Sequence, residues 1–157
     1  GSTQHLLHQL KYGNRAEIGN VLGEWYAADL VDSMREHHMN LIVPVPLHKI
    51  KQRKRGYNQS EGFARGLSEV LGIEMRPNLL VRVKHSATQT KKSKIARWEN
   101  VENVFKVTSP DYLADKNILL VDDVITTGAT LGSCANELLA KGAASVSIAT
   151  IAVAEYF

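Results

Sequence analysis

Two adjacent carboxylates, Asp122 and Asp123, stand directly before a loop of threonine and glycine. Like charges at the end of a buried strand are costly unless a hydroxyl-rich or cationic ligand is bound there. The loop offers hydroxyls and backbone N–H groups that can surround an anion, namely those of Thr126, Thr127, Gly128, Ala129 and Thr130. The carboxylates can accept hydrogen bonds from vicinal hydroxyls while the loop holds a phosphate. The ligand that this arrangement predicts is a ribose 5-phosphate.

The elements around this motif are predicted to be a strand, a tight loop and a helix. Residues 117–121 form a short apolar, β-branched run typical of a strand buried on both faces, and residues 131–140 carry apolar residues at helical spacing. The helix dipole would add partial positive charge at the loop. For a lone Thr-Thr-Gly the alternative is an ordinary capped turn. Neither a Walker-type lysine nor a G-x-G-x-x-G fingerprint is present.

Positive charge is concentrated in two segments that contain no acidic residue. The segment 37–60 has five basic residues and the segment 75–98 has seven, out of 19 Lys and Arg in a chain of net charge +3. An isolated charge run is usually a solvated face. Because the first run follows a predicted central strand, we expect both segments to face a polyanion.

Length and composition predict one globular domain. The chain has 157 residues, of which 44% are hydrophobic and 22% charged. It has no apolar run long enough to span a membrane and no secretion signal at its start, and Gly1-Ser2 resembles a cleavage scar. The single cysteine, Cys134, is expected in the core, and a cytoplasmic location fits its reduced state.

Helical and strand patterns alternate along the chain. Predicted helices cover residues 4–11, 15–35 and 61–71, predicted strands cover residues 41–43, 79–83, 104–107 and 146–153, and residues 84–103 form a mobile loop. The basic run after residue 43 is predicted to be a loop because two prolines end the strand. This order predicts an α/β three-layer sandwich with a mainly parallel central sheet. Ligands on such sheets lie at the carboxyl ends of the strands, where the strand order reverses.

The pattern of residues 121–130 resembles the phosphoribosyl pyrophosphate (PRPP) signature of type I phosphoribosyltransferases, in which two acidic residues lead from a strand into a Thr-Thr-Gly-x-Thr loop. Further landmarks resemble the ComF family of competence-related proteins, whose C-terminal domain is phosphoribosyltransferase-like. They are Lys11-Tyr12-Gly13, Pro44-Val45-Pro46, Arg55-Gly56-Tyr57-Asn58-Gln59, Gln89 and Arg97-Trp98-Glu99-Asn100. The resemblance covers nearly the whole chain.

This resemblance implies a role for each part of the site. Asp122 and Asp123 would bind the ribose hydroxyls as the catalytic pair, and residues 126–130 would hold the 5-phosphate. Three further sets follow: Pro44, Val45, Pro46, Arg53 and Arg55 at the pyrophosphate; Gln89, Lys91 and Arg97 in a flexible lid; and Mg²⁺ bound mainly through PRPP and pyrophosphate, without a protein ligand set. Residues 1–157 would form one domain with residues 1–40 as a small helical hood. The activity implied is transfer of phosphoribosyl from PRPP to an amine or nucleobase, within nucleotide metabolism.

One family feature is missing. Family members usually carry a four-cysteine zinc module at the N-terminus, which a single cysteine cannot build. Either the chain was trimmed or this member lacks the module. The acceptor is not defined by the sequence: Trp25 and Tyr26 could stack a base, but their place on an amphipathic helix favours the core. Histidines 5, 8, 37 and 38 are interpreted as surface or capping residues.

Three hypotheses remain open at the level of sequence. The first is a phosphoribosyltransferase and the second a PRPP sensor without turnover. The third is a nucleic-acid-handling accessory of DNA uptake that binds single-stranded DNA or DNA-processing proteins through the basic segments, with Tyr57 and Trp98 as stacking partners. A homodimer is compatible with all three, and no membrane partner is expected.

Overall fold

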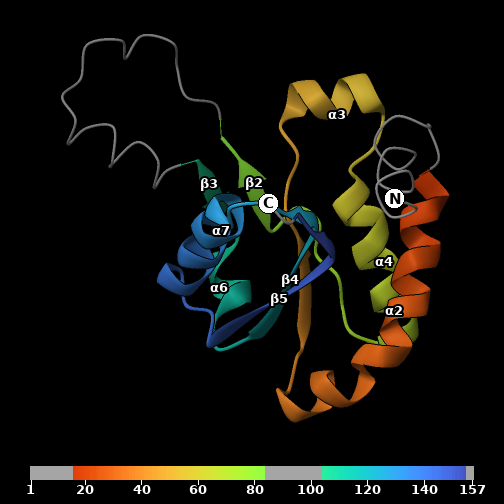
Figure 1. Cartoon of the computed structure of the whole chain (residues 1–157). Helices are drawn as coiled ribbons and strands as arrows, with labels where there is room; N and C mark the ends of the chain where they lie inside the picture. The colour runs from red at the N-terminus through yellow and green to blue at the C-terminus, as the bar shows by residue number, and fades with distance from the viewer. Residues whose placement is uncertain (1–15, 84–103, 155–157) are drawn as a thin grey trace, which may run out of the picture.

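A computed structural model describes residues 16–83 and 104–154 of the chain. Helices and strands alternate along it (Figure 1). The elements are α2 (Ala16–Glu36), β1 (Leu41–Pro44), α3 (Lys49–Arg55), α4 (Gln59–Leu71), β2 (Leu80–Arg82), β3 (Phe105–Val107), α6 (Pro110–Leu113), β4 (Asn117–Ile125), α7 (Ala129–Ala140) and β5 (Ser145–Val153).

The central sheet is parallel and has the strand order β1-β4-β5. On the side of β1 that faces away from β4, Ile42 also forms a parallel bridge with Met75. The chain therefore runs outward from β1 and returns to β4 on the other side, so that the strand order reverses between β1 and β4. A crevice at the carboxyl ends of these two strands is the expected place for a ligand. A separate antiparallel ribbon pairs β2 with β3.

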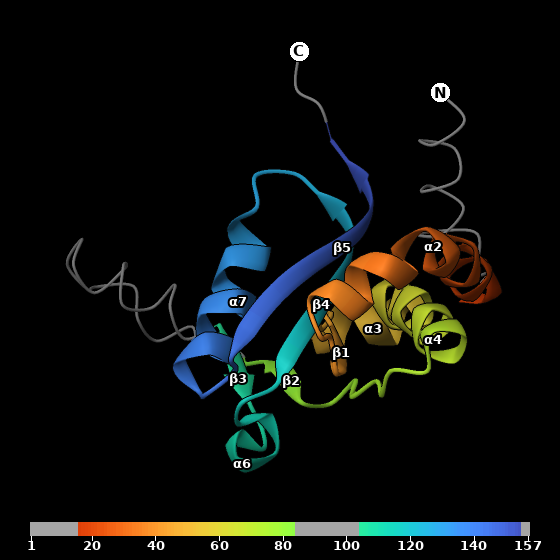
Figure 2. The same ribbon diagram turned by 90° about the horizontal axis from the view of Figure 1, so that it is seen from below.

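Alternate residues of β1 and β4 feed two hydrophobic cores, one on each face of the sheet. Leu41 and Ile118 belong to the core that includes Leu131 and Leu138 of α7. Ile42 and Leu119 belong to the core beneath α2 and α4, with the members Leu22, Ala27, Met34, Phe63, Ala64 and Leu67. Helices thus cover both faces of the sheet (Figure 2). The three-layer arrangement predicted from the sequence is confirmed.

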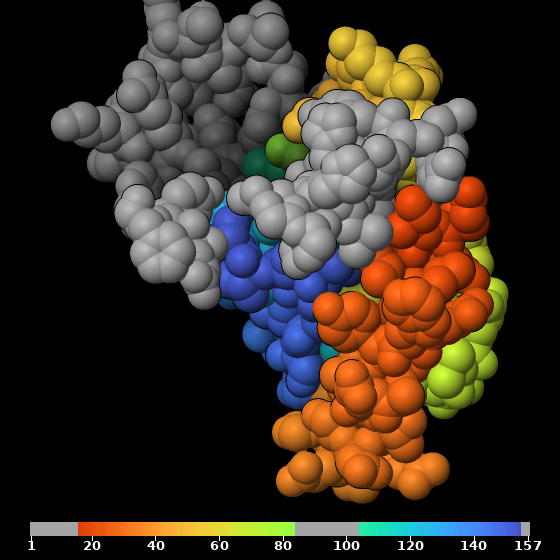
Figure 3. Space-filling view, turned by 45° about the vertical axis from the view of Figure 1, so that its right-hand side comes forward, coloured from red at the N-terminus to blue at the C-terminus, as the bar shows by residue number. Residues whose placement is uncertain are grey.

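Helices α2 and α4 pack backbone against backbone. A Cβ added to Gly23 would lie 2.3 Å from the carbonyl oxygen of Phe63, and one added to Gly66 would lie 2.1 Å from that of Asn20. Only glycine permits this approach. Helix α2 forms an outer flank of the molecule, with β5 beside it (Figure 3). Residues 16–36, which were expected to belong to a small helical hood, thus form a helix that packs with α4 over one face of the sheet.

The basic run after β1 is a helix, and the expectation of a loop was wrong. Lysine, arginine and glutamine are good helix formers, and both ends of α3 are capped. The ring Nδ1 of His48 accepts a hydrogen bond from the N–H of Ile50 at 3.2 Å, and Gly56 ends the helix in the left-handed conformation at φ 80°. None of the seven residues of α3 is buried.

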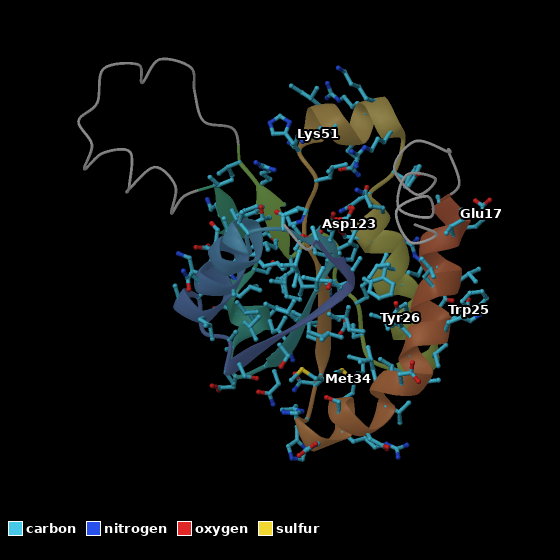
Figure 4. The ribbon with its side chains drawn as sticks, viewed as in Figure 1. Glu17, Trp25, Tyr26, Met34, Lys51 and Asp123 are labelled. Atoms are coloured by element: carbon cyan, nitrogen blue, oxygen red, sulfur yellow. The ribbon has the colours of Figure 1, made fainter. Side chains whose placement is uncertain are left out.

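The two aromatic residues of α2 differ in their surroundings. Trp25 is 70% exposed, so its expected place in the core was wrong, and it points away from the sheet (Figure 4). Tyr26 points toward the sheet, packs edge-on against Phe63 and donates a hydrogen bond to the carbonyl of Ile151 at 3.4 Å. Cys134 is buried as expected, and burial raises the pKa of its thiol to about 12. Neither His37 nor His38 is buried.

Two further expectations lie outside the described residues: the first predicted helix, over residues 4–11, and the loop over residues 84–103. Within the described part of the chain, no helix combines the length and the apolar character that crossing a membrane would need.

Candidate active site

The two carboxylates lie on the part of β4 that extends past the end of β1. Pro44, the last residue of β1, stands opposite Val121, whereas Asp122 pairs only with Thr150 of β5. Strand β4 therefore continues past β1 and ends at Ile125, four residues later than the sequence predicted. Both carboxylates are on this extension, at the edge of the sheet where the strand order reverses.

Asp123 is 9% exposed and has hydrogen-bond donors on both of its oxygens. Its Oδ2 accepts from Nε2 of Gln59 at 3.0 Å, and its Oδ1 accepts from the backbone N–H of Val124 at 2.8 Å. A buried carboxylate needs such donors because it has lost its water. The orientation of this side chain is therefore defined by the protein.

Asp122 is held at one oxygen. Its Oδ1 accepts from the hydroxyl of Ser60 at 2.9 Å and from the backbone N–H of Asp123 at 2.8 Å. Burial, followed by the neighbouring Asp123 carboxylate, raises the pKa of Asp122 to about 6, while the Ser60 hydroxyl opposes the rise. Asp122 thus carries an electrostatic cost of the kind that the sequence predicts for adjacent carboxylates.

The first turn of α4 ties the loop after β1 to the acidic pair. Asn58 caps the helix: its Oδ1 accepts from the N–H of Ser60 at 3.1 Å, and its Nδ2 donates to the carbonyl of Val45 at 3.0 Å. Val45 in turn donates its N–H to the carbonyl of Val121 at 2.8 Å. The loop with Pro44, Val45 and Pro46, predicted to hold pyrophosphate, is therefore fixed beside Val121, directly before the acidic pair on β4.

The loop between β4 and α7 has the character expected of an anion site. Gly128 adopts the left-handed conformation at φ 79°, and no side chain caps α7. The N–H of Ala129 makes only a long contact with the hydroxyl of Thr127, at 3.3 Å. Four of the five predicted phosphate-binding residues are exposed at this turn, namely Thr126, Thr127, Ala129 and Thr130, and Gly128 is half-buried. Such a helix start can bind an anion.

The predicted arginines both lie on α3. Arg53 is exposed and Arg55 is half-buried, and α3 begins three residues after Pro46. Figure 4 shows Lys51 on α3, above Asp123 in that view. In the second acid-free segment, two arginines have partners within the chain: Arg76 forms an ion pair with Glu74 at 2.7 Å, and Arg82 lies over the ring of Phe105. The predicted lid residues Gln89, Lys91 and Arg97 lie outside the described residues.

Gln59 and Ser60 contact the carboxylates directly, although no site role was predicted for either residue. Helix α4 begins at Gln59, two residues before the predicted start at residue 61. A signal was present in the sequence: Asn58 followed by Glu61 has the spacing of a capping box, which places Gln59 and Ser60 in the first turn.

The donors among the described residues suit an Mg²⁺ ion that would arrive with phosphate. The described residues contain no group of three or more His, Cys, Asp or Glu side chains that could hold a metal ion. Mg²⁺ retains waters and is commonly bound with substrate phosphates rather than in an all-protein cage. The prediction of Mg²⁺ held mainly through a diphosphate remains compatible with this donor set.

The acidic pair, the open loop and their shared position where the strand order reverses define a class of protein. The chain belongs to the phosphoribosyl transferase domain family, whose sequence pattern matches residues 28–155.

Named relatives specify the family further. The chain is 34% identical over 146 residues to DNA utilization protein YhgH of Escherichia coli K12, covering 91% of this chain and 63% of that protein. It is 34% identical over 147 residues to competence protein F of Haemophilus influenzae, covering 91% and 64%. Competence protein ComFC of Bacillus subtilis is 35% identical over 148 residues, covering 92% and 57%. The resemblance to the ComF family is confirmed, and the chain spans less than two thirds of these relatives.

Solved structures share the fold. Glutamine PRPP amidotransferase of B. subtilis superposes with a TM-score of 0.61 at 20% identity, covering 87% of this chain and 26% of that chain. Purine phosphoribosyltransferase of Pyrococcus horikoshii has a TM-score of 0.51 at 23% identity, covering 82% and 74%. The type I phosphoribosyltransferase fold predicted from the sequence is thereby confirmed.

Proposed function

We propose that this domain binds PRPP and transfers its phosphoribosyl group to an amine or nucleobase with release of pyrophosphate. The observation that carries the proposal is that two internally hydrogen-bonded carboxylates, the half-buried Asp122 and the buried Asp123, lie just before an open helix start. A ribose with a 5-phosphate needs both: carboxylates for its hydroxyls and N–H groups for its phosphate.

In this reaction the bond between C1 of the ribose and the pyrophosphate oxygen breaks, and the sugar develops positive charge before the acceptor nitrogen bonds to C1. Asp122 and Asp123 would orient the sugar by accepting hydrogen bonds from its hydroxyls. The loop 44–46 and the arginines of α3 would stabilise the negative charge that develops on the leaving pyrophosphate. Mg²⁺ bound to the diphosphate would supply further neutralisation of that charge.

Titration calorimetry with PRPP, with and without Mg²⁺, tests the binding step. Replacing both Arg53 and Arg55 with Ala should reduce PRPP affinity by about 2 to 4 kcal/mol, at about 1 to 2 kcal/mol for each charge-assisted hydrogen bond, and leave ribose 5-phosphate affinity nearly unchanged. A matched control removes Arg35 and Lys141, two exposed cations before the amino ends of β1 and β5. A double arginine variant with full PRPP affinity would show that the pyrophosphate site is elsewhere.

Turnover needs its own assay. Release of pyrophosphate across a panel of nucleobases and amines distinguishes a transferase from a sensor, because a sensor binds PRPP with the same residues and releases nothing.

A second candidate function is handling of single-stranded nucleic acid. The observation that favours it is α3, which has five Lys or Arg among seven residues and buries none of them. The names of the relatives, a DNA utilization protein and competence proteins, agree with this use. A cationic helix at the rim of the crevice can bind a phosphate backbone.

Competition separates the two functions. PRPP with Mg²⁺ should displace a bound oligonucleotide if both ligands use α3 and the crevice. The double arginine variant should then also flatten the salt dependence of oligonucleotide binding, by about 0.7 in the log–log slope for each phosphate that the variant no longer neutralises. An oligonucleotide that stays bound at saturating PRPP would place the nucleic-acid surface elsewhere.

A further inference from the structure

Three consecutive residues at the start of α4 each bond to a different part of the candidate site. Asn58 donates to the carbonyl of Val45, Gln59 donates to Asp123, and Ser60 donates to Asp122. All three are at least nine-tenths buried, with exposures of 9%, 5% and 3%. Polar side chains rarely occupy such positions unless their hydrogen bonds are needed.

The amide of Gln59 indicates what its bond is for. Its Nε2 faces the Asp123 carboxylate, and the opposite assignment would set two oxygens without a proton against each other. Its Oε1 is buried and has no hydrogen-bond partner among the described residues. An acceptor without a donor disfavours burial of the amide. The stabilising contact that this side chain offers the site is therefore its N–H bond to Asp123.

We propose that Gln59 and Ser60 are positioning residues, which hold the two carboxylates in the orientation that receives the sugar hydroxyls. We call the hydrogen bonds of Asn58, Gln59 and Ser60 the brace. Asn58 connects the brace to the loop after β1, so the first turn of α4 positions both the residues for the ribose and the loop for the pyrophosphate. This inference rests on the proposed binding of PRPP. It assigns a role to side chains that do not themselves need to touch the ligand.

The surroundings of Asp122 make the role measurable. Besides burial, the Asp123 carboxylate on the same strand raises the pKa of Asp122 and the Ser60 hydroxyl of α4 lowers it, while the Asp122 carboxylate raises, and Arg82 of β2 lowers, the pKa of the buried Cys134 thiol of α7. The Ser60 hydroxyl lowers the pKa of Asp122 against the effect of burial. Its removal should raise that pKa, so that Asp122 loses its charge at a higher pH and binds sugar hydroxyls less well there.

The experiment measures PRPP affinity by calorimetry with Mg²⁺ between pH 5.5 and 8.5 for the wild type, Ser60→Ala and Gln59→Met. Ser68→Ala is the matched control, because it removes a hydroxyl of the same helix that bonds to the carbonyl of Ile73, away from the carboxylates. Inorganic phosphate serves as a probe without sugar hydroxyls.

Ser60→Ala should weaken PRPP binding about 10-fold near pH 6, recover most of it by pH 8.5, and shift the midpoint of the pH profile upward. Gln59→Met should weaken it about 10-fold across the range with little loss of thermal stability, since it also removes the unpaired Oε1. Both variants should bind inorganic phosphate as the wild type does, and Ser68→Ala should keep the PRPP profile of the wild type.

Wild-type affinity and an unchanged pH profile in both variants would overturn the inference. An equal loss of phosphate and PRPP affinity would also overturn it, because that result indicates a general collapse of the site. If Gln59→Met does not fold, Ser60→Ala alone decides by its profile. Failure of the wild type to bind PRPP at any pH would overturn the proposed function, and this inference with it.

Discussion

The two helices that start at the candidate site, α4 and α7, have contrasting N-termini. Helix α4 is capped by the side chain of Asn58, and its first turn is buried and bonded to neighbouring elements. Helix α7 follows a left-handed glycine, Gly128, lacks a side-chain cap and begins among exposed residues. Both termini present the same backbone chemistry, a turn of N–H groups without helical partners.

The difference shows that one helix terminus positions site residues while the other is available to bind a ligand. The closed terminus of α4 uses its polar side chains to orient Asp122 and Asp123, so it contributes to the site through other residues. The open terminus of α7 keeps its N–H groups for an anion. Loss of the Asn58 cap should therefore lower stability at the first terminus, whereas a change in the loop at the second should mainly lower ligand affinity.

The largest effect is expected at the carboxylates that α4 orients. Asp123→Asn or Asp122→Asn should weaken PRPP binding by about 100-fold or more, as two charge-assisted hydrogen bonds would, while the fold is retained. Calorimetry gives the affinity and circular dichroism reports the fold. Unchanged affinity in both variants would rule out the ribose assignment.

A smaller effect is expected at the open terminus. Gly128→Val should weaken ribose 5-phosphate and PRPP alike, by about 10- to 30-fold, because a β-branched residue is strained at φ 79° and its side chain would crowd a phosphate held by the backbone of this loop. Gly132→Ala is the control: it lies within α7, and an added Cβ there has no neighbour within 4 Å. It should bind normally and gain about 0.5 to 1 kcal/mol of stability. A folded Gly128→Val protein with normal binding of both ligands would make this loop a simple helix start.

The closed terminus should reveal itself in the free energy of unfolding. Asn58→Ala removes a helix cap and a bond to Val45, and should cost about 1 to 2 kcal/mol. Thr127→Ala, at the open terminus, removes only a long contact and should cost less than about 0.5 kcal/mol. Urea unfolding of the two variants measures both. Equal losses would mean that the two termini do not differ as described.

The smallest effect concerns pH. The pKa of Asp122 is raised from 3.8 to about 6, so the folded state keeps this proton to a higher pH than the unfolded chain does. The contribution of this group to stability therefore falls as pH rises from about 4 to about 6 and stays low above that. The fall should be of the order of 1 kcal/mol, since solvent partly screens the group, and Asp122→Asn should lack it. Thermal unfolding of the ligand-free protein across this range measures the slope, and equal slopes would contradict the shift.

The architecture is predictable from the sequence because its signals are local. Alternating helix and strand patterns and apolar runs indicate the parallel sheet, and the residues before α7 indicate the acidic pair and the loop. Short-range pattern suffices because each of these elements is defined by its own side chains and by the prolines and glycines that end it.

The brace at α4 is not predictable in the same way. Its bonds join residues 64 and 62 positions apart, Gln59 to Asp123 and Ser60 to Asp122, and no local pattern encodes a partner at that distance. The prediction of a loop for the basic run failed because charge alone says little about helix formation, whereas the caps His48 and Gly56 decide it. The prediction for Trp25 failed because glycines, rather than an indole, occupy the packed face of α2.

The two sides of helix α2 therefore differ greatly in the side chains that they can accommodate. On one side a single methyl group at Gly23 has no room, because it would meet three backbone atoms of α4 within 3 Å. On the other side an indole at Trp25 stands 70% exposed. A protein engineer who wishes to attach a fluorophore, a crosslinker or a surface tether without disturbing the crevice thus has a defined attachment point at position 25, and an equally defined forbidden one two residues earlier.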